Sequence, residues 1–302
     1  MYCEHFGLQR LPFSITPDTS FAYSSAAQRG ALNTLLLTTE AGEGFVTITG
    51  EVGSGKTLLC RRFLAILEGA RAGGARIRTA YLPNPCLTPP ALLRAIAAEL
   101  RLRPADAGSE HGLLEGLNRA LLRLAARGVR IVVCLDEAQA MPPDTLEALR
   151  LLSNLETEQR KLLQIVLFGQ LELDALLGTA RLHPLRSRIA FSYRLQRLTP
   201  AETAGYVEHR LATAGRAGAL FTPAALRSLH RGAAGLPRRL NILAHKALLV
   251  AYGQGAAAVE ARHVRIARAD ASDVRSARRS LAGIAHWLRH AGGALAALGA
   301  AR

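Results

Sequence analysis

The stretch Gly50-Glu51-Val52-Gly53-Ser54-Gly55-Lys56-Thr57 decides the fold that this sequence predicts. It matches the phosphate-binding loop pattern in full. In that pattern the glycines let the backbone wrap around a phosphate without Cβ clashes, and successive N–H groups point toward the anion. We expect all of these residues to bind a nucleotide, with the Lys56 ammonium reaching the β- and γ-phosphates and the Thr57 hydroxyl ligating Mg²⁺.

The neighbours of this loop support the match. A short β-branched run over 45–49 precedes it, and a helix is expected over 56–68 directly after it. The amino-terminal end of that helix then faces the phosphates, where its free N–H groups and its dipole favour an anion.

Two carboxylates follow a second strand candidate. The nearly continuous apolar run over 129–135 is typical of a strand buried on both faces, and Asp136 and Glu137 come directly after it. The carboxyl end of a central parallel strand lies at the usual ligand crevice, beside the phosphate loop. We expect Asp136 to hold Mg²⁺ and Glu137 to polarise the attacking water, so the sequence predicts hydrolysis of ATP.

Strands and helices alternate through the first two thirds of the chain. Strands are expected over 45–49, 76–82, 129–135, 162–168 and 189–195, and helices over 25–40, 56–68, 90–102, 111–126 and 143–158. Such alternation predicts an α/β fold in which helices cover both faces of a parallel sheet.

The pattern changes after Thr199-Pro200. Helices are expected over 201–214, 223–232, 238–252 and 260–268, without a strand between them. We therefore expect a nucleotide-binding domain over 1–197, a small all-helical lid domain over 198–270 and a basic amphipathic tail over 271–302. The proline-rich opening predicts a tethered loop.

Composition limits the class of protein. With 302 residues, 49% of them hydrophobic, the chain can bury a core, and no apolar run reaches the roughly 18 residues of a transmembrane helix. The amino terminus does not resemble a secretory signal peptide, which predicts a cytoplasmic protein. The cysteines at positions 3, 60, 86 and 134 are scattered, so we expect reduced, mostly buried thiols.

The net charge of +15 is distributed unevenly. Residues 201–302 carry 15 basic and 5 acidic side chains, whereas the balance is close to even before them. This asymmetry predicts a polyanionic neighbour, either nucleic acid or an anionic membrane surface. The apolar and basic residues over 275–302 are typical of a segment that lies on such a membrane or packs on its own domain.

Several motifs together resemble one family. In chain order they are Phe6-Gly7-Leu8, Pro12-Phe13, the phosphate loop, Asp136-Glu-Ala-Gln139, Gly169-Gln170 and Gly235-Leu-Pro-Arg-Arg-Leu-Asn241. Over about residues 1–270 this order resembles the ExeA/GspA/MshM group, which are AAA-type ATPases of the general secretion pathway and of MSHA-type pilus biogenesis.

The resemblance implies further roles. Gln170 takes the place of the sensor of the γ-phosphate, and Arg238 that of the second sensor in the lid. Arg186 or Arg188 takes the place of the arginine finger that acts on a neighbouring subunit. The resemblance also implies a homo-oligomer that works with secretion or pilus assembly proteins, at the periphery of the inner membrane.

Two other functions stay open on the sequence alone. Transposition and replication-initiation ATPases carry a similar Asp-Glu-Ala-Gln box, and for them the basic last third is the DNA-contacting surface. A nucleotide-dependent scaffold with little turnover is the other alternative, against which Glu137 argues.

Overall fold

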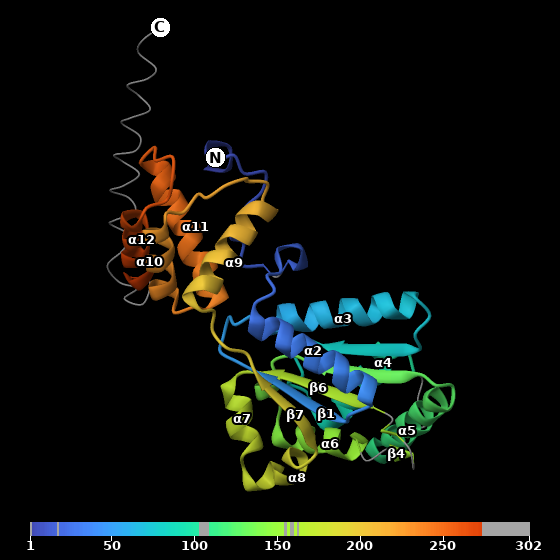
Figure 1. The fold of residues 1–302 in the computed structure, drawn as a ribbon. Coiled ribbons are helices and arrows are strands. Elements are labelled where there is room, and N and C mark those ends of the chain that lie inside the picture. Colours follow the sequence, from blue (N-terminus) through green and yellow to red (C-terminus); the bar gives the residue numbers. More distant parts are fainter. Residues whose placement is uncertain are drawn as a thin grey trace, which may run out of the picture. The chain divides into compact units, whose positions relative to one another are not determined.

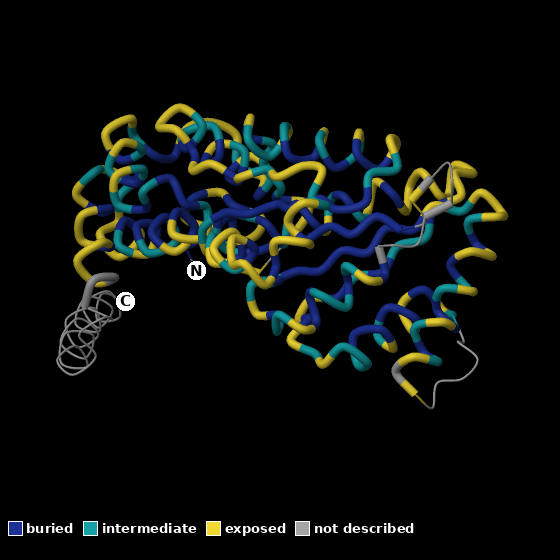
Figure 2. The backbone as a smooth tube through the Cα atoms, turned by 90° about the horizontal axis from the view of Figure 1, so that it is seen from below, coloured by how far each residue is buried: buried dark blue, intermediate teal, exposed yellow. Residues whose placement is uncertain are grey.

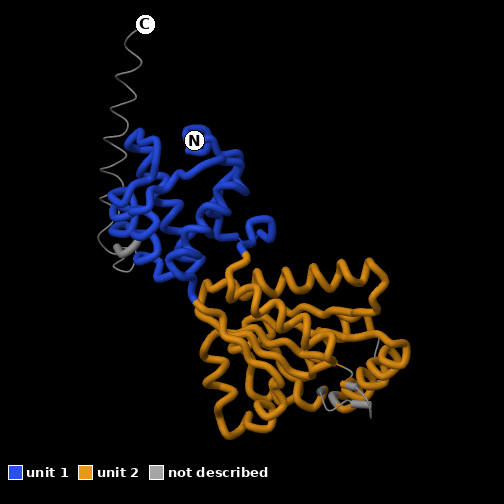
Figure 3. Tube along the Cα trace, in the orientation of Figure 1, with its two compact units in different colours: residues 1–23, 197–302 blue, residues 24–196 orange. Residues whose placement is uncertain are grey.

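The computed structural model describes residues 2–16, 18–102, 109–153, 156–157, 160–161 and 163–273. The chain forms two compact units (Figure 3). The sheet unit consists of residues 24–196, and the helical unit of residues 1–23 together with 197–302. Residues 1–23 were expected in the nucleotide-binding domain, and the structure groups them with the helices instead. The tail prediction lies outside the described residues from position 274 onward.

A five-stranded sheet forms the centre of the sheet unit, in the order β2-β3-β6-β1-β7 (Figure 1). Its strands are β1 (Phe45–Thr49), β2 (Ile77–Leu82), β3 (Arg130–Leu135), β6 (Gln164–Gly169) and β7 (Ile189–Arg194). Every pair of neighbouring strands in it is parallel. The parallel sheet predicted from the alternation of strands and helices is confirmed.

Helices bury both faces of this sheet. On one face, alternate strand residues such as Val133 and Leu167 pack in one cluster with helices α4, α5 and α6. On the other face, Val132 and Phe168 pack with α2 and α3. The central strands β1 and β6 are buried at every residue, whereas the edge strand β7 is mostly exposed, and Figure 2 shows buried strand segments through the middle of the sheet unit. The helices are α2 (Ala26–Ala41), α3 (Lys56–Ala72), α4 (Pro89–Glu99), α5 (Glu110–Ala126) and α6 (Pro143–Ser153).

The cysteines are free, and two of the four, Cys60 and Cys134, are buried in the face that α2 and α3 cover. Cys86 is exposed, so the expectation of mostly buried thiols holds for half of them.

Among the described residues, no helix is both long enough and apolar enough to cross a bilayer.

The region between α6 and β7 differs from the prediction. The helix expected over 143–158 ends at Ser153, and β4 (Glu156–Thr157) pairs with β5 (Arg160–Lys161) antiparallel after it. Residues such as Glu and Arg favour helix intrinsically, but this preference is weak and strand pairing overrides it. Three short elements, α7 (Leu171–Leu177), η3 (Ala180–Leu182) and α8 (His183–Arg186), were not predicted. They are too short to display a helical period.

The helices expected after Thr199 are confirmed. They are α9 (Pro200–Thr213), α10 (Pro223–Ala233), α11 (Pro237–Gly253) and α12 (Ala261–Asp273). The first three begin with proline, whose fixed φ suits the first turn. The side chains of Thr199 and Thr222 cap α9 and α10 by accepting N–H bonds.

The opening of the chain, predicted as a tethered loop, is a strap held on the helical unit. Helix α1 (Tyr2–His5) and the turn η1 (Thr19–Phe21) flank it, and Phe6 and Phe13 are buried among the helices. Arg210, which is 6% exposed, holds the strap: its Nε donates to Pro12 O at 2.5 Å and its guanidinium also bonds Ser14 O. The apolar area that the aromatic rings bury stabilises this segment, although its prolines favour a loop.

Candidate active site

The phosphate loop joins β1 to α3, and its backbone requires glycine. Gly53 and Gly55 have φ angles of 81° and 98°, in the left-handed region that L side chains rarely adopt. A Cβ on Gly50 would lie 2.9 Å from Ser54 Oγ and 3.2 Å from Leu195 Cβ. The glycines that suggested the loop are therefore needed to build it.

Lys56 lies inside the loop. Its side chain is 5% exposed, and its Nζ donates to Gly50 O at 2.9 Å and to Glu51 O at 3.0 Å. Burial lowers the pKa of this ammonium, while nearby carboxylates, Glu137 first, partly offset the shift. The ammonium is thus held at the mouth of the loop by carbonyls that an anion can replace.

The two carboxylates after β3 have different surroundings. Asp136 is 2% exposed and accepts hydrogen bonds from the Thr57 hydroxyl and, at 3.0 Å, from the N–H of Glu137. Burial raises the pKa of Asp136, and these bonds partly offset that effect. Glu137 has a left-handed backbone, with φ 55° and ψ 37°. Such a conformation in a non-glycine residue occurs preferentially at functional sites.

A network of amides surrounds Glu137. Its Oε2 accepts from Gln139 Nε2 at 2.6 Å and from Gln170 Nε2 at 3.0 Å. The N–H of Gln170 donates to Gln139 Oε1 at 2.9 Å. Burial raises the pKa of Glu137, but the two amide bonds and the Lys56 charge outweigh it, so the pKa is lowered and the carboxylate stays ionised.

Gln139 is a site residue that the sequence analysis did not assign. It lies in η2 (Ala138–Ala140), directly after Glu137. The signal in the sequence is its place in the Asp136-Glu-Ala-Gln139 box, two residues after Glu137.

The residues of this crevice fit a magnesium nucleotide. Ser54 Oγ is buried and bonds none of the described residues, although a hydroxyl in such a place normally has a partner. The loop around it offers glycine-built backbone of the kind that binds phosphate. The Thr57 hydroxyl and the Asp136 carboxylate supply oxygen ligands, which Mg²⁺ prefers.

The arginines predicted as fingers lie at the other end of the sheet. Ile189, the first residue of β7, pairs with Phe45 at the start of β1, whereas the phosphate loop follows Thr49 at its end. At about 3.3 Å per residue the strand separates Arg188 from its own loop by roughly 15 Å. Arg186 ends α8 nearby and is exposed. Neither arginine is brought into its own chain's phosphate site.

Arg238 lies in the first turn of α11, in the helical unit, and its side chain is exposed. The N–H of Leu198, at the start of this unit, donates to Gly235 O at 2.9 Å, just before that helix. Arg238 therefore lies at a helix start whose backbone is held by a hydrogen bond within the helical unit.

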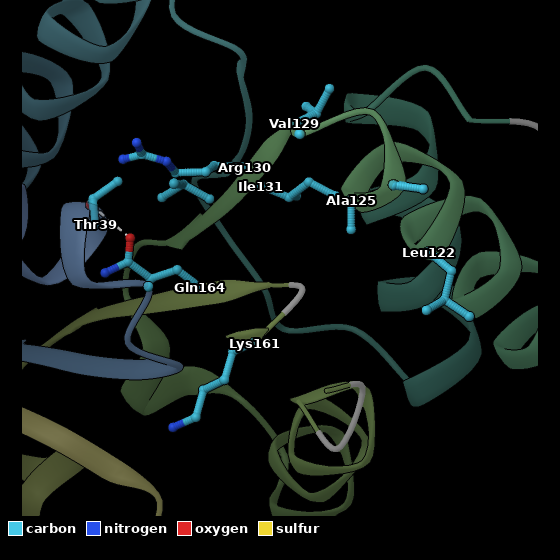
Figure 4. Close-up of a pocket in the computed structure, with 12 residues that line it drawn as sticks. Thr39, Leu122, Ala125, Val129, Arg130, Ile131, Lys161 and Gln164 are labelled. Carbon is cyan, nitrogen blue, oxygen red and sulfur yellow. Dashed lines mark hydrogen bonds between the residues drawn. The ribbon is translucent and has the colours of Figure 1, made fainter. Parts of the chain in front are cut away.

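A cavity of about 400 Å³ opens at the amino-terminal ends of β3 and β6 (Figure 4). Apolar residues such as Leu122 and Ile131 line it, and Gln164 in its wall accepts from the Thr39 hydroxyl at 2.7 Å. The cavity is separate from the phosphate loop, which lies at the opposite ends of the strands.

Comparisons with known proteins agree with this architecture. Residues 39–177 match the family model described as AAA domain. The chain is 41% identical over 276 residues to the General secretion pathway protein A of Aeromonas hydrophila, covering 91% of this chain and 49% of that protein. The chain thus spans about half the length of this curated relative.

Solved structures share the fold at low identity. The ORC1 protein of Aeropyrum pernix, solved in complex with DNA, is 22% identical, with a TM-score of 0.63 over 86% of this chain and 69% of that one. The Thermotoga maritima RuvB Holliday junction branch migration motor is 18% identical, with a TM-score of 0.53 over 81% and 68%. The chain therefore has an AAA-type fold and resembles the ExeA/GspA group, as its motifs predicted.

Proposed function

We propose that this chain is a Mg²⁺-dependent, ATP-hydrolysing AAA-type ATPase that supports assembly of a secretion or type IV/MSHA-like pilus machine at the inner membrane. The observation that carries the proposal is the crevice in which the phosphate loop, the Thr57–Asp136 pair and the ionised Glu137 carboxylate converge.

Each residue of the crevice has a separate task. The loop from Gly50 to Thr57 binds the phosphates, and Lys56 leaves its loop carbonyls for the β- and γ-phosphates. Thr57 and Asp136 would hold Mg²⁺, which would neutralise charge on the phosphates. Glu137 takes a proton from the attacking water, and Gln170 orients that water.

By resemblance, Arg238 in the helical unit takes the role of the second sensor of the γ-phosphate. Because Arg186 and Arg188 lie far from their own phosphate loop, one of them serves the site of a neighbouring subunit. The protein therefore works as a homo-oligomer, in which each interface completes one active site.

This arrangement predicts complementation between two inactive variants. Arg188→Ala or Arg186→Ala, whichever removes the finger, is expected to slow hydrolysis by roughly 10³-fold while leaving ATP affinity unchanged. Mixing that variant with Glu137→Gln restores part of the rate, because the intact halves meet at one interface. Arg181→Ala is the control, since Arg181 lies in the same segment but bonds Asp144. A rate per subunit that does not change between dilute and concentrated protein would contradict action in trans.

The similarity to the General secretion pathway protein A favours secretion as the cellular role. The basic last third favours the alternative, a DNA-binding ATPase of the transposition or replication-initiation type. The ORC1 and RuvB structures share the fold of this chain, but their sequence identity is too low to decide between the two roles.

A genetic test separates these two roles. Deleting the gene is expected to stop assembly of the secretion or pilus machine, and the wild-type chain, but not Glu137→Gln, is expected to restore it. Purified protein is expected to bind a 30-base-pair duplex (about three helical turns) no more tightly with ATP than without it. Normal assembly in the deletion strain, together with ATP-dependent duplex binding, would favour the DNA-binding role.

A further inference from the structure

The Glu137 carboxylate is held by one of its two oxygens. Both amide bonds, from Gln139 and from Gln170, go to Oε2. Among the residues that the structure describes, none donates to Oε1. A carboxylate fixed in this way keeps a free oxygen in a defined direction, which is what a general base needs in order to take a proton from water.

The bond from Gln139 is the shorter of the two, at 2.6 Å against 3.0 Å. Both bonds go to an ionised acceptor, which makes each stronger than a bond between neutral groups, and the shorter one holds the Gln139 amide directly against the carboxylate.

The direction of the Gln139 amide is fixed from its other side. The N–H of Gln170 can only donate, so the atom that faces it at 2.9 Å must be the amide oxygen. The NH₂ group then points to Glu137. One side chain therefore links the carboxylate after β3 to the backbone at the end of β6.

The backbone beneath Gln139 is also held. Ala140 N–H donates to Glu137 O at 2.9 Å, and Met141 N–H donates to Ala138 O at 3.1 Å. Ala138 and Met141 on either side are buried in the core. The backbone of this short turn is held by hydrogen bonds and by packing, so the Gln139 amide has little freedom to move away from the Glu137 carboxylate.

We propose that Gln139 is a positioning residue for hydrolysis: it holds Glu137 by Oε2 so that Oε1 faces the attacking water, and it ties that carboxylate to the strand end that carries Gln170. The inference rests on the proposed function. It assigns Gln139 no contact with the nucleotide, so the residue affects the rate of the chemical step and not ATP binding.

Two substitutions test this in the full chain, with ATP and Mg²⁺ as the probe. Gln139→Met fills the same volume but removes donor and acceptor, and is expected to lower kcat by about 10- to 100-fold with KM and ATP affinity nearly unchanged. Gln139→Glu keeps an oxygen for the Gln170 N–H but sets a second negative charge against Glu137. We expect it to lower kcat at least as much, since the retained acceptor does not restore the lost donor.

A double variant separates positioning from a structural role. In single-turnover experiments on a Glu137→Gln background, adding Gln139→Met is expected to change the rate by less than about two-fold, because Gln139 acts through the carboxylate that is already gone. A structural role would lower the rate, the ATP affinity or the unfolding midpoint on either background. Any of those losses on the Glu137→Gln background overturns the inference.

The remaining outcomes are also decisive. If the wild-type chain hydrolyses ATP and Glu137→Gln does so far more slowly, an unchanged or raised kcat in Gln139→Met overturns the inference alone. If the wild-type chain binds ATP without hydrolysing it, the proposed function fails, and the inference fails with it.

Discussion

Glu137→Gln is expected to bind ATP as the wild-type chain does and to hydrolyse it about 10²- to 10⁴-fold more slowly. The substitution keeps the shape of the side chain but removes the group that takes a proton from water. The proposed phosphate contact of Lys56 and the proposed Mg²⁺ ligand Asp136 are unchanged. Phosphate release under single-turnover conditions, together with equilibrium binding of ATP, measures both effects.

Glu172→Gln is the matched control for this variant. Glu172 lies in the first turn of α7, is exposed, and contributes to the electrostatic surroundings of Lys56 without bonding Glu137. We expect this control to hydrolyse ATP at close to the wild-type rate. Hydrolysis by Glu137→Gln at the wild-type rate, with Mg²⁺ present, would show that another group activates the water.

Gly235→Val is expected to destabilise the helical unit by about 3–5 kcal/mol. Gly235 has a φ of 71°, and a Cβ there would lie 2.3 Å from the carbonyl oxygen of Leu198. The backbone around Leu198 must then move, which breaks the 2.9 Å bond from its N–H to Gly235 O. Urea unfolding followed by circular dichroism measures the loss.

Gly218→Val separates the clash from the backbone conformation. Gly218 has a φ of 87°, and a Cβ there would meet nothing within 4 Å. We expect this variant to lose only the cost of the left-handed conformation, about 1–2 kcal/mol. Equal losses in the two variants would mean that the contact with Leu198 contributes nothing to stability.

The sheet and the phosphate loop were predictable because their signals are local. Phe45 to Thr49 and the run over 129–135 are short, apolar and rich in β-branched residues, and each is followed by polar residues at the strand end. Parallel strands place those ends at one edge, so the convergence of Asp136 with the loop follows from the order of elements. Two of the helices after Thr199 also carry a local start signal, Thr199-Pro200 for α9 and Thr222-Pro223 for α10.

Long-range contacts account for what the sequence did not predict. The strap depends on Arg210, which lies some two hundred positions from the carbonyls of Pro12 and Ser14 that it binds. The Gln139 amide is oriented by the N–H of Gln170, which follows a different strand, β6. No local periodicity encodes such pairs. The roles assigned to Gln170, Arg186, Arg188 and Arg238 stay predictions until they are measured.

The most direct test of the account is equilibrium binding of ATP to the full chain and to Lys56→Ala. We expect the phosphates to bind in the loop that Lys56 now closes through Gly50 O and Glu51 O. Saturable, one-site binding is expected for the wild-type chain, and at least about 100-fold weaker binding for Lys56→Ala, with the circular dichroism spectrum unchanged. Equal affinities, or no binding to the wild-type chain in the presence of Mg²⁺, would contradict the claim that this crevice is a nucleotide site.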